Sequence, residues 1–220
     1  MSTVAILPIK SFSRAKQRLA PDVSEELRAE LAEAMAADVL DALARVSGLD
    51  AVVVVTRDES ARSLAQAAGA ACLDDPAEAG QSAATALAIG SMSANHERVL
   101  LVAGDCPALD PVELDALLAR EPEAETEVVI VPDRHRTGTN ALLLTPPHAI
   151  SPSFGPDSRA RHLDLAAGAG VACTEAELHS LALDVDDAAD LDALRTELAA
   201  QPDRALRTRA VLERIADLSS

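Results

Sequence analysis

Short apolar runs alternate with longer amphipathic segments along most of the 220-residue chain. Residues 51–55 are continuously apolar and mostly Val, which is typical of a parallel strand buried on both faces. In the segment that precedes this run, Leu27, Leu31 and Met35 recur at helical spacing and share one face. Strands that alternate with helices predict right-handed crossovers and a mostly parallel sheet.

The same pattern gives the expected elements one by one. Strands are expected at residues 4–9, 51–55, 71–73, 97–102, 127–131, 141–144 and 181–186. Helices are expected at residues 25–45, 58–68, 81–90, 111–120, 158–167, 188–199 and 203–218. Residues 133–140 and the proline-rich stretch 146–157 are expected to be loops. No linker, repeat or low-complexity segment interrupts the series, so residues 1–220 are predicted to form a single α/β domain.

Composition limits the function. The formal net charge is -17, and the aromatic residues are Phe12 and Phe154 alone. Nucleic-acid binding is therefore not expected, since it needs basic surfaces and often aromatic stacking platforms. The three cysteines are widely spaced, which is typical of the reducing cytosol, and no run reaches membrane-spanning length. We expect a soluble cytoplasmic protein whose N-terminus is a strand and not a signal peptide.

The first predicted strand runs into a polar loop that carries Lys10, Arg14, Lys16 and Arg18. Lys10 and Lys16 are the only lysines of the chain; all other cations are Arg. A compact ammonium suits the oxygens of a polyphosphate, and the carboxyl end of a first strand is a common place to bind an anion. The loop is a candidate phosphate site, although a solvated turn with ordinary surface charge is the alternative.

Carboxylates follow two other predicted strands. Asp105 follows the strand 97–102 at its carboxyl end. Asp184 and Asp186 stand at the end of the strand 181–186, where the alternation of side chains would place these two acids on one face. Mg²⁺ takes one or two carboxylates and fills its remaining positions with water and substrate phosphate. The three acids therefore form a candidate Mg²⁺ site. The alternative is that Asp184, Asp186 and Asp187 cap the helix near residue 188, a role that suits Asp187.

Two further segments could bind a small anion. Residues 134–140 place hydroxyl and amide groups around a glycine, and residues 154–158 lead into a helix N-terminus with Ser158 as a candidate N-cap. Arg159 and Arg161 would add positive charge there. A capped helix without a ligand explains the second segment equally well. His162 is more typical of a structural histidine, and the other histidines show no metal-ligand spacing.

Taken together, these motifs resemble one family over nearly the whole chain. The motifs are Leu7-Pro8-Ile9-Lys10 with Arg14-Ala15-Lys16-Gln17-Arg18-Leu19, Gly104-Asp105-Cys106-Pro107-Ala108-Leu109, Thr137-Gly138-Thr139-Asn140, Phe154-Gly155-Pro156-Asp157-Ser158 with His162, and Asp184-Val185-Asp186. They are similar to the guanylyltransferases of coenzyme F-420 biosynthesis, which act on phosphoenolpyruvate in bacteria and on 2-phospho-L-lactate in archaea. Where many relatives carry a Leu-Asn pair, this chain has Gln81-Ser82.

The resemblance implies a Rossmann-like nucleotidyltransferase fold of the GT-A type, with a mixed, mostly parallel central sheet and helices on both faces. It implies that Thr139, Gly155 and Ser158 bind phosphoenolpyruvate and that Asp105, Asp184 and Asp186 bind the metal. It assigns Lys16 and its neighbours to the nucleotide-phosphate loop. The segment at Gln81-Ser82 is expected near the nucleobase.

The predicted reaction is transfer of GMP from GTP to the phosphate of phosphoenolpyruvate, with Asp105 and Lys16 as the catalytic residues. Lys10 and Arg14 help Lys16 to neutralise the triphosphate, and Mg²⁺ is the expected cofactor. A labile product would be handed to the next enzyme of the pathway. Alternatives are 2-phospho-L-lactate or 3-phosphoglycerate as acceptor, a related transferase for another phosphate, and a non-catalytic nucleotide-binding module. The 154–158 motif argues against the related transferase, and the retained acids and lysines argue against the pure binder.

Overall fold

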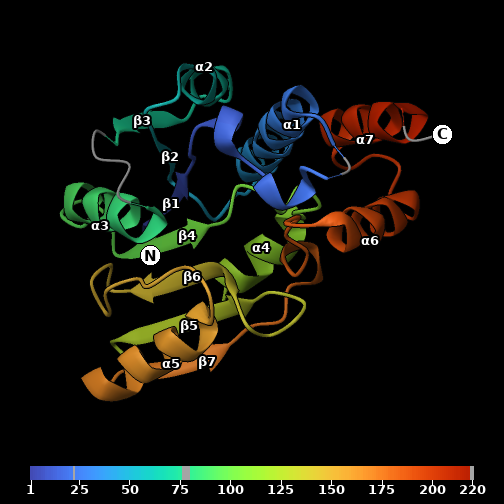
Figure 1. Ribbon diagram of the computed structural model, residues 1–220. Coiled ribbons are helices and arrows are strands. Elements are labelled where there is room, and N and C mark those ends of the chain that lie inside the picture. Colours follow the sequence, from blue (N-terminus) through green and yellow to red (C-terminus); the bar gives the residue numbers. More distant parts are fainter. Residues whose placement is uncertain (22, 76–79, 219–220) are drawn as a thin grey trace.

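A mixed sheet forms the centre of the molecule in the computed structural model, which describes residues 1–21, 23–75 and 80–218 (Figure 1). Its strand order is β3-β2-β1-β4-β6-β5-β7. Strand β6 runs antiparallel to both β4 and β5, whereas the other neighbours are parallel. The strands are β1 (Thr3–Pro8), β2 (Ala51–Thr56), β3 (Ala71–Asp74), β4 (Arg98–Val102), β5 (Glu127–Pro132), β6 (Thr139–Thr145) and β7 (Ala172–Glu175).

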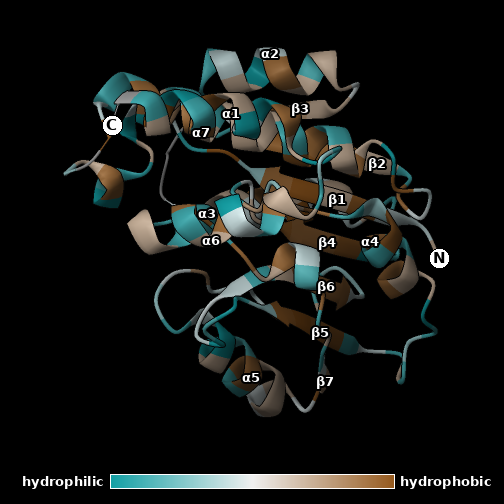
Figure 2. Cartoon of the chain, turned by 90° about the vertical axis from the view of Figure 1, so that its right-hand side faces the viewer, coloured by the Kyte–Doolittle hydropathy of each residue, from teal (hydrophilic) through white to brown (hydrophobic). Residues whose placement is uncertain are grey.

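Helices cover both faces of this sheet. Apolar side chains of α1, α2 and α4 pack with one face, and those of α3 and α5 pack with the other. Figure 2 shows the result, with hydrophobic strands between helices that carry both hydrophilic and hydrophobic residues. The helices are α1 (Glu25–Leu43), α2 (Glu59–Ala67), α3 (Gln81–Met92), α4 (Pro111–Leu118), α5 (Ser158–Ala169), α6 (Ala188–Ala199) and α7 (Leu206–Leu218). None of the described helices is long and apolar enough to cross a membrane.

The last two helices pack away from the sheet. Apolar residues of α6 and α7 form a separate cluster with α1, in which Met35 of α1 is fully buried. Leu19 and Val185 belong to the same cluster, and both flank segments that carry candidate site residues. Figure 1 shows α7 alongside α1 at one end of the molecule. The C-terminal helices therefore fix the position of the first loop and of residues 182–187.

The sheet agrees with the predicted α/β class, and six of the predicted strands are confirmed within one or two residues. The strand predicted at residues 181–186 is wrong, because this segment contains the end of a 3₁₀ helix, η3 (His179–Leu181), and then an irregular stretch. The alternation of apolar and acidic residues in this segment still corresponds to burial, since Leu181, Leu183 and Val185 are all buried. The strand β7, which pairs with β5, was not predicted.

A buried carboxylate joins the first and last helices. Asp38 of α1 accepts hydrogen bonds from the backbone nitrogens of Arg207 and Thr208, at 3.3 and 2.8 Å, and from the Thr208 hydroxyl at 2.7 Å. These nitrogens lie in the first turn of α7, where backbone donors have no partner within the helix. Asp38 therefore caps α7 from a neighbouring helix.

Replacing Asp38 with Ala should destabilise the protein by about 2–3 kcal/mol, because Thr208 is fully buried and its donors would lose their acceptor. Urea denaturation followed by circular dichroism measures the change. Asp41→Ala is the matched control, since Asp41 pairs with the exposed Arg207 guanidinium on the surface and should contribute no more than about 1 kcal/mol. Equal losses in the two variants would contradict the capping role.

Candidate active site

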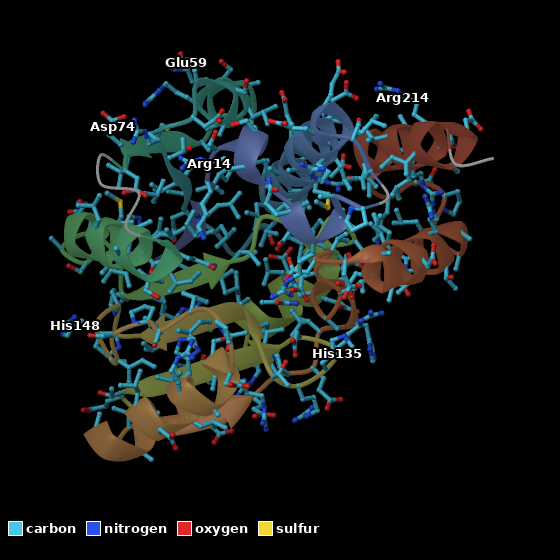
Figure 3. The ribbon with its side chains drawn as sticks, viewed as in Figure 1. Arg14, Glu59, Asp74, His135, His148 and Arg214 are labelled. Carbon is cyan, nitrogen blue, oxygen red and sulfur yellow. The ribbon has the colours of Figure 1, made fainter. Side chains whose placement is uncertain are left out.

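A cleft of about 1020 Å³ opens at the carboxyl ends of β1 and β4 and at the start of β6. Arg14 and His135 both line this cleft, and their labelled side chains lie well apart in Figure 3. Every site residue predicted from the sequence lines this cleft: Lys10, Arg14, Lys16, Asp105, Thr139, Gly155, Ser158, Asp184 and Asp186. The fold thus brings together residues that lie up to 176 positions apart, from Lys10 to Asp186.

Lys16 lies at the centre of the charged part of the cleft. It stands between two short 3₁₀ helices, η1 (Phe12–Arg14) and η2 (Gln17–Leu19), in a left-handed conformation with φ of 53°. Its Nζ donates to an oxygen of Asp105 and lies 3.2 Å from an oxygen of Asp186. Burial lowers the pKa of Lys16, but the charges of Asp105 and Asp186 raise it by more, so the net shift is upward. Lys16 is therefore charged at any working pH.

The carboxylates around Lys16 are held by backbone and amide groups. The backbone nitrogen of Val185 donates to the carbonyl of Asp105 at 3.3 Å, which joins the segment 182–187 to the end of β4. Asn140 donates from Nδ2 to an oxygen of Asp184 at 3.1 Å and to the carbonyl of Leu181 at 2.8 Å. Burial and the charge of Asp105 raise the pKa of Asp184 to about 6, although the bond from Asn140 opposes the shift.

These carboxylates fit a divalent cation by their chemistry, because Mg²⁺ prefers hard oxygen donors, and the raised pKa of Asp184 reflects its burial together with the nearby charge of Asp105. The geometry differs from the one expected. In the described part of the chain, no three acidic, His or Cys groups surround one point as metal ligands. The ammonium of Lys16 lies between Asp105 and Asp186 instead. Asp184 and Asp186 come from an irregular segment and not from one face of a strand.

Asp190 holds this irregular segment in place. One of its oxygens accepts from the backbone nitrogens of Asp186 and Asp187, at 2.8 and 3.0 Å, and the other pairs with Arg134. Asp187 in turn caps α6, which confirms the role expected for it. The sequence reasoning missed Asp190, and it named Asn140 within a candidate anion loop without connecting it to Asp184. A signal for Asp190 was present, since Asp187 and Asp190 have the spacing of a capping box.

The opposite wall of the cleft contains Thr139, Gly155 and Ser158. Thr139 and Asn140 are the first residues of β6 and are buried, so the loop predicted over residues 133–140 ends earlier. Gly155 has a φ of 111°, which a residue with a side chain rarely adopts. Ser158 is the first residue of α5; the N-cap position belongs to Asp157 and not to Ser158.

The Gly155 turn is attached to its neighbours by other side chains. Ser82 of α3 accepts from the backbone nitrogen of Phe154 at 2.9 Å, while its neighbour Gln81 lines the cleft. Arg161 donates to the carbonyls of Ser153 and Pro156. The pair at which the chain departs from many relatives thus supports the turn through Ser82 and faces the cleft through Gln81.

Most arginines on this wall are paired with protein carboxylates. Arg134 pairs with Asp190, and Arg136 and Arg159 both pair with Glu175. The positive charge expected from residues 134–140 and from Arg159 is therefore largely neutralised within the protein. His135 and His148 are exposed and lie on different sides of the molecule (Figure 3).

Comparison with known proteins adds to this geometry. Residues 3–198 match the family model described as "Guanylyl transferase CofC like". A phosphoenolpyruvate guanylyltransferase of Conexibacter woesei is 50% identical over 98% of this chain and 97% of its own length. A 3-phospho-D-glycerate guanylyltransferase of Phenylobacterium zucineum is 36% identical over 98% of this chain and 96% of its own.

Solved structures agree at the level of the fold. A nucleotide-diphospho-sugar transferase of Desulfovibrio desulfuricans superposes with a TM-score of 0.72 at 15% identity, covering 98% of this chain and 99% of that one. A nucleotidyl transferase of Methanothermobacter gives a TM-score of 0.63 at 17% identity, with 90% and 98% covered. The predicted nucleotidyltransferase fold is therefore confirmed, and the chain belongs to the family of CofC-like guanylyl transferases.

Proposed function

We propose that this protein transfers GMP from GTP to the phosphate of phosphoenolpyruvate, giving enolpyruvoyl-2-diphospho-5'-guanosine and pyrophosphate in coenzyme F-420 biosynthesis. The observation that carries the proposal is the meeting of two groups of residues in one cleft. Lys16, Asp105 and Asp186 form a charged centre, and Thr139, Gly155 and Ser158 form a small polar wall opposite. The name of the Conexibacter relative, at 50% identity over nearly the full length, supports this acceptor.

The chemistry requires positioning and charge neutralisation more than proton transfer. An oxygen of the acceptor phosphate attacks the α-phosphorus of GTP, and the bond from this phosphorus to the bridging oxygen of pyrophosphate breaks. The acceptor phosphate is already ionised near neutral pH, so no general base is needed. Lys16, helped by Lys10 and Arg14, neutralises charge on the triphosphate, while Thr139, Gly155 and Ser158 hold the acceptor in line.

We assign Mg²⁺ to the carboxylates of Asp105 and Asp186, with Asp184 beside them. Their hard oxygen donors and crowded negative charge support this assignment. When bound there, the ion would supply electrostatic stabilisation of the charge that develops on the reacting phosphates. Asn140 and Asp190 act on this site indirectly, because they fix the carboxylate of Asp184 and the backbone of Asp186.

The strongest alternative keeps the mechanism and changes the acceptor. The Phenylobacterium relative is named for 3-phospho-D-glycerate at 36% identity, and 2-phospho-L-lactate remains an alternative of the same size. 2-Phospho-L-lactate has a methyl group where phosphoenolpyruvate has a double bond, and 3-phosphoglycerate has a free hydroxyl on C2 and its phosphate on C3. Such differences are often worth only a few kcal/mol in a binding site.

The labile diphosphate product would be handed directly to the next enzyme of the pathway. We place this reaction in the cytosol. The three described cysteines are free, which is consistent with a reducing compartment.

Turnover with each acceptor tests the proposal directly. Pyrophosphate release would be followed with GTP and Mg²⁺, offering phosphoenolpyruvate, 2-phospho-L-lactate and 3-phosphoglycerate separately. A parallel run would contain the downstream enzyme that consumes the product. Turnover with phosphoenolpyruvate is expected. Turnover with only one of the other two acids would identify that acid as the acceptor. Absence of turnover with all three acids would favour a non-catalytic nucleotide-binding module.

Asp105→Asn should lower kcat at least about 100-fold, because it removes a charged group next to the reacting phosphates. The same variant should also need more Mg²⁺ for half-maximal activity. Asp192→Asn is the matched control, since Asp192 lies on the exposed side of α6 with a side chain 77% exposed. Circular dichroism checks that both variants fold. Normal turnover by Asp105→Asn would show that the assignment of Asp105 is wrong.

A further inference from the structure

His162 is buried behind the acceptor wall and has partners on three sides. It lies in α5 and is fully buried, and it is not one of the described residues that line the cleft. The backbone nitrogen of Ser153 lies 2.9 Å from its Nε2, and the Thr139 hydroxyl lies 3.0 Å from its Nδ1. The Phe154 ring meets it edge to face, with centroids 5.2 Å apart. The ring is thus held in one orientation.

These contacts determine where the ring carries its proton. A backbone N–H can only donate, so Nε2 of His162 must accept from Ser153. Burial and the charge of Arg161 lower the pKa of His162 to about 4, so the ring is neutral near pH 7 and has one N–H group. This N–H is therefore at Nδ1, and it must donate to the oxygen of Thr139.

The direction of this bond decides what Thr139 can do. A hydroxyl has one proton and two lone pairs, and His162 occupies one lone pair. The hydroxyl proton of Thr139 must then point to another acceptor, and Thr139 is among the residues that line the cleft. Among the described residues, His162 is the hydrogen-bond partner seen for this hydroxyl. A donor directed into the cleft suits the phosphate or carboxylate oxygens of an anionic acceptor, which only accept.

We propose that His162 is a positioning residue that orients the Thr139 hydroxyl as a hydrogen-bond donor to the anionic acceptor substrate. Its second nitrogen anchors Ser153, two residues before Gly155, so one ring links β6 to the Gly155 turn. The inference rests on the proposed function, because that function places the acceptor beside Thr139, Gly155 and Ser158. It adds a residue that does not itself touch the substrate.

Two replacements separate the two nitrogens of the ring. The side-chain amide of Asn reaches about as far as Nδ1 of His, so His162→Asn keeps a donor for Thr139 and loses the acceptor for Ser153. The amide of Gln reaches about as far as Nε2, so His162→Gln keeps the acceptor and loses the donor. Thr139→Val removes the hydroxyl, and Thr139→Ser retains it as a control.

The decisive measurement is a double-mutant cycle on the KM for phosphoenolpyruvate at saturating GTP, or for whichever acceptor the wild-type enzyme uses. Thr139→Val and His162→Gln should each raise this KM by about 10- to 100-fold, the value of a hydrogen bond to a charged group. The KM for GTP should stay unchanged. The double variant should be no worse than Thr139→Val alone, and His162→Asn and Thr139→Ser should raise this KM by less than His162→Gln and Thr139→Val do.

The inference would be overturned if the KM increases of the two single variants multiplied in the double variant. It would also be overturned if the KM for GTP rose as much as the KM for the acceptor. The ¹⁵N shifts of the His162 ring in the wild-type protein provide a test that needs no variant. They should report a neutral ring protonated at Nδ1, and protonation at Nε2 would overturn the inference even if the variants do not fold. Absence of turnover with every acceptor would overturn the proposed function instead, and the ring shifts would still decide the role of His162.

Discussion

The ion pairs of Lys16 with Asp105 and Asp186 are the interaction on which the cleft depends. They join the first loop, the end of β4 and the segment before α6, which no strand pairing connects. The Lys16 side chain is only 9% exposed, so removal of either carboxylate would leave the charge of Lys16 poorly compensated in a largely buried position. The apolar cluster of α1, α6 and α7 supports the same arrangement, because Leu19 and Val185 are anchored in it on either side of the pair. Charge and packing thus fix the same three segments.

The antiparallel strand β6 explains how the two walls of the cleft come to face each other. In an all-parallel sheet, the residues at the start of a strand lie at the edge opposite to the ligand crevice. Because β6 runs against β4, its first residues lie beside the end of β4, with Val102 opposite Ala141 and the nitrogen of Ala103 bonded to the carbonyl of Asn140. Thr139 and Asn140 are therefore next to Asp105. The acceptor wall and the charged centre share a sheet edge because one strand is reversed.

The sequence predicted most of the sheet, because β1, β2 and β4 are apolar runs buried on both faces. The prediction missed β7, a short half-buried strand of mixed residues. It was wrong at residues 181–186, whose alternating burial comes from side-chain packing and not from pairing with a neighbouring strand. Asp105 could be found because a carboxylate follows an apolar strand, and Lys16 because it is one of the two lysines of the chain and lies in the polar loop after the first strand. Asp190 holds its neighbours Asp186 and Asp187 through a capping-box spacing that is visible in the sequence. Asn140 and His162 instead act through partners 9 to 44 positions away, such as Ser153 for His162 and Asp184 for Asn140. Only the folded chain shows these partners.

The use of lysine in the first loop follows from the way arginine is used in the segments around the cleft. The planar fork of Arg suits fixed pairs, and Arg134, Arg136 and Arg159 each hold a wall segment to a protein carboxylate. Arg18, at the rim, reaches Asp186 at 3.5 Å with a side chain that is 73% exposed. Lys16 has a compact ammonium that can be shared by Asp105 and Asp186, and its donors rotate freely. An anion that enters the cleft can therefore compete for Lys16 without breaking the arginine pairs that shape the walls.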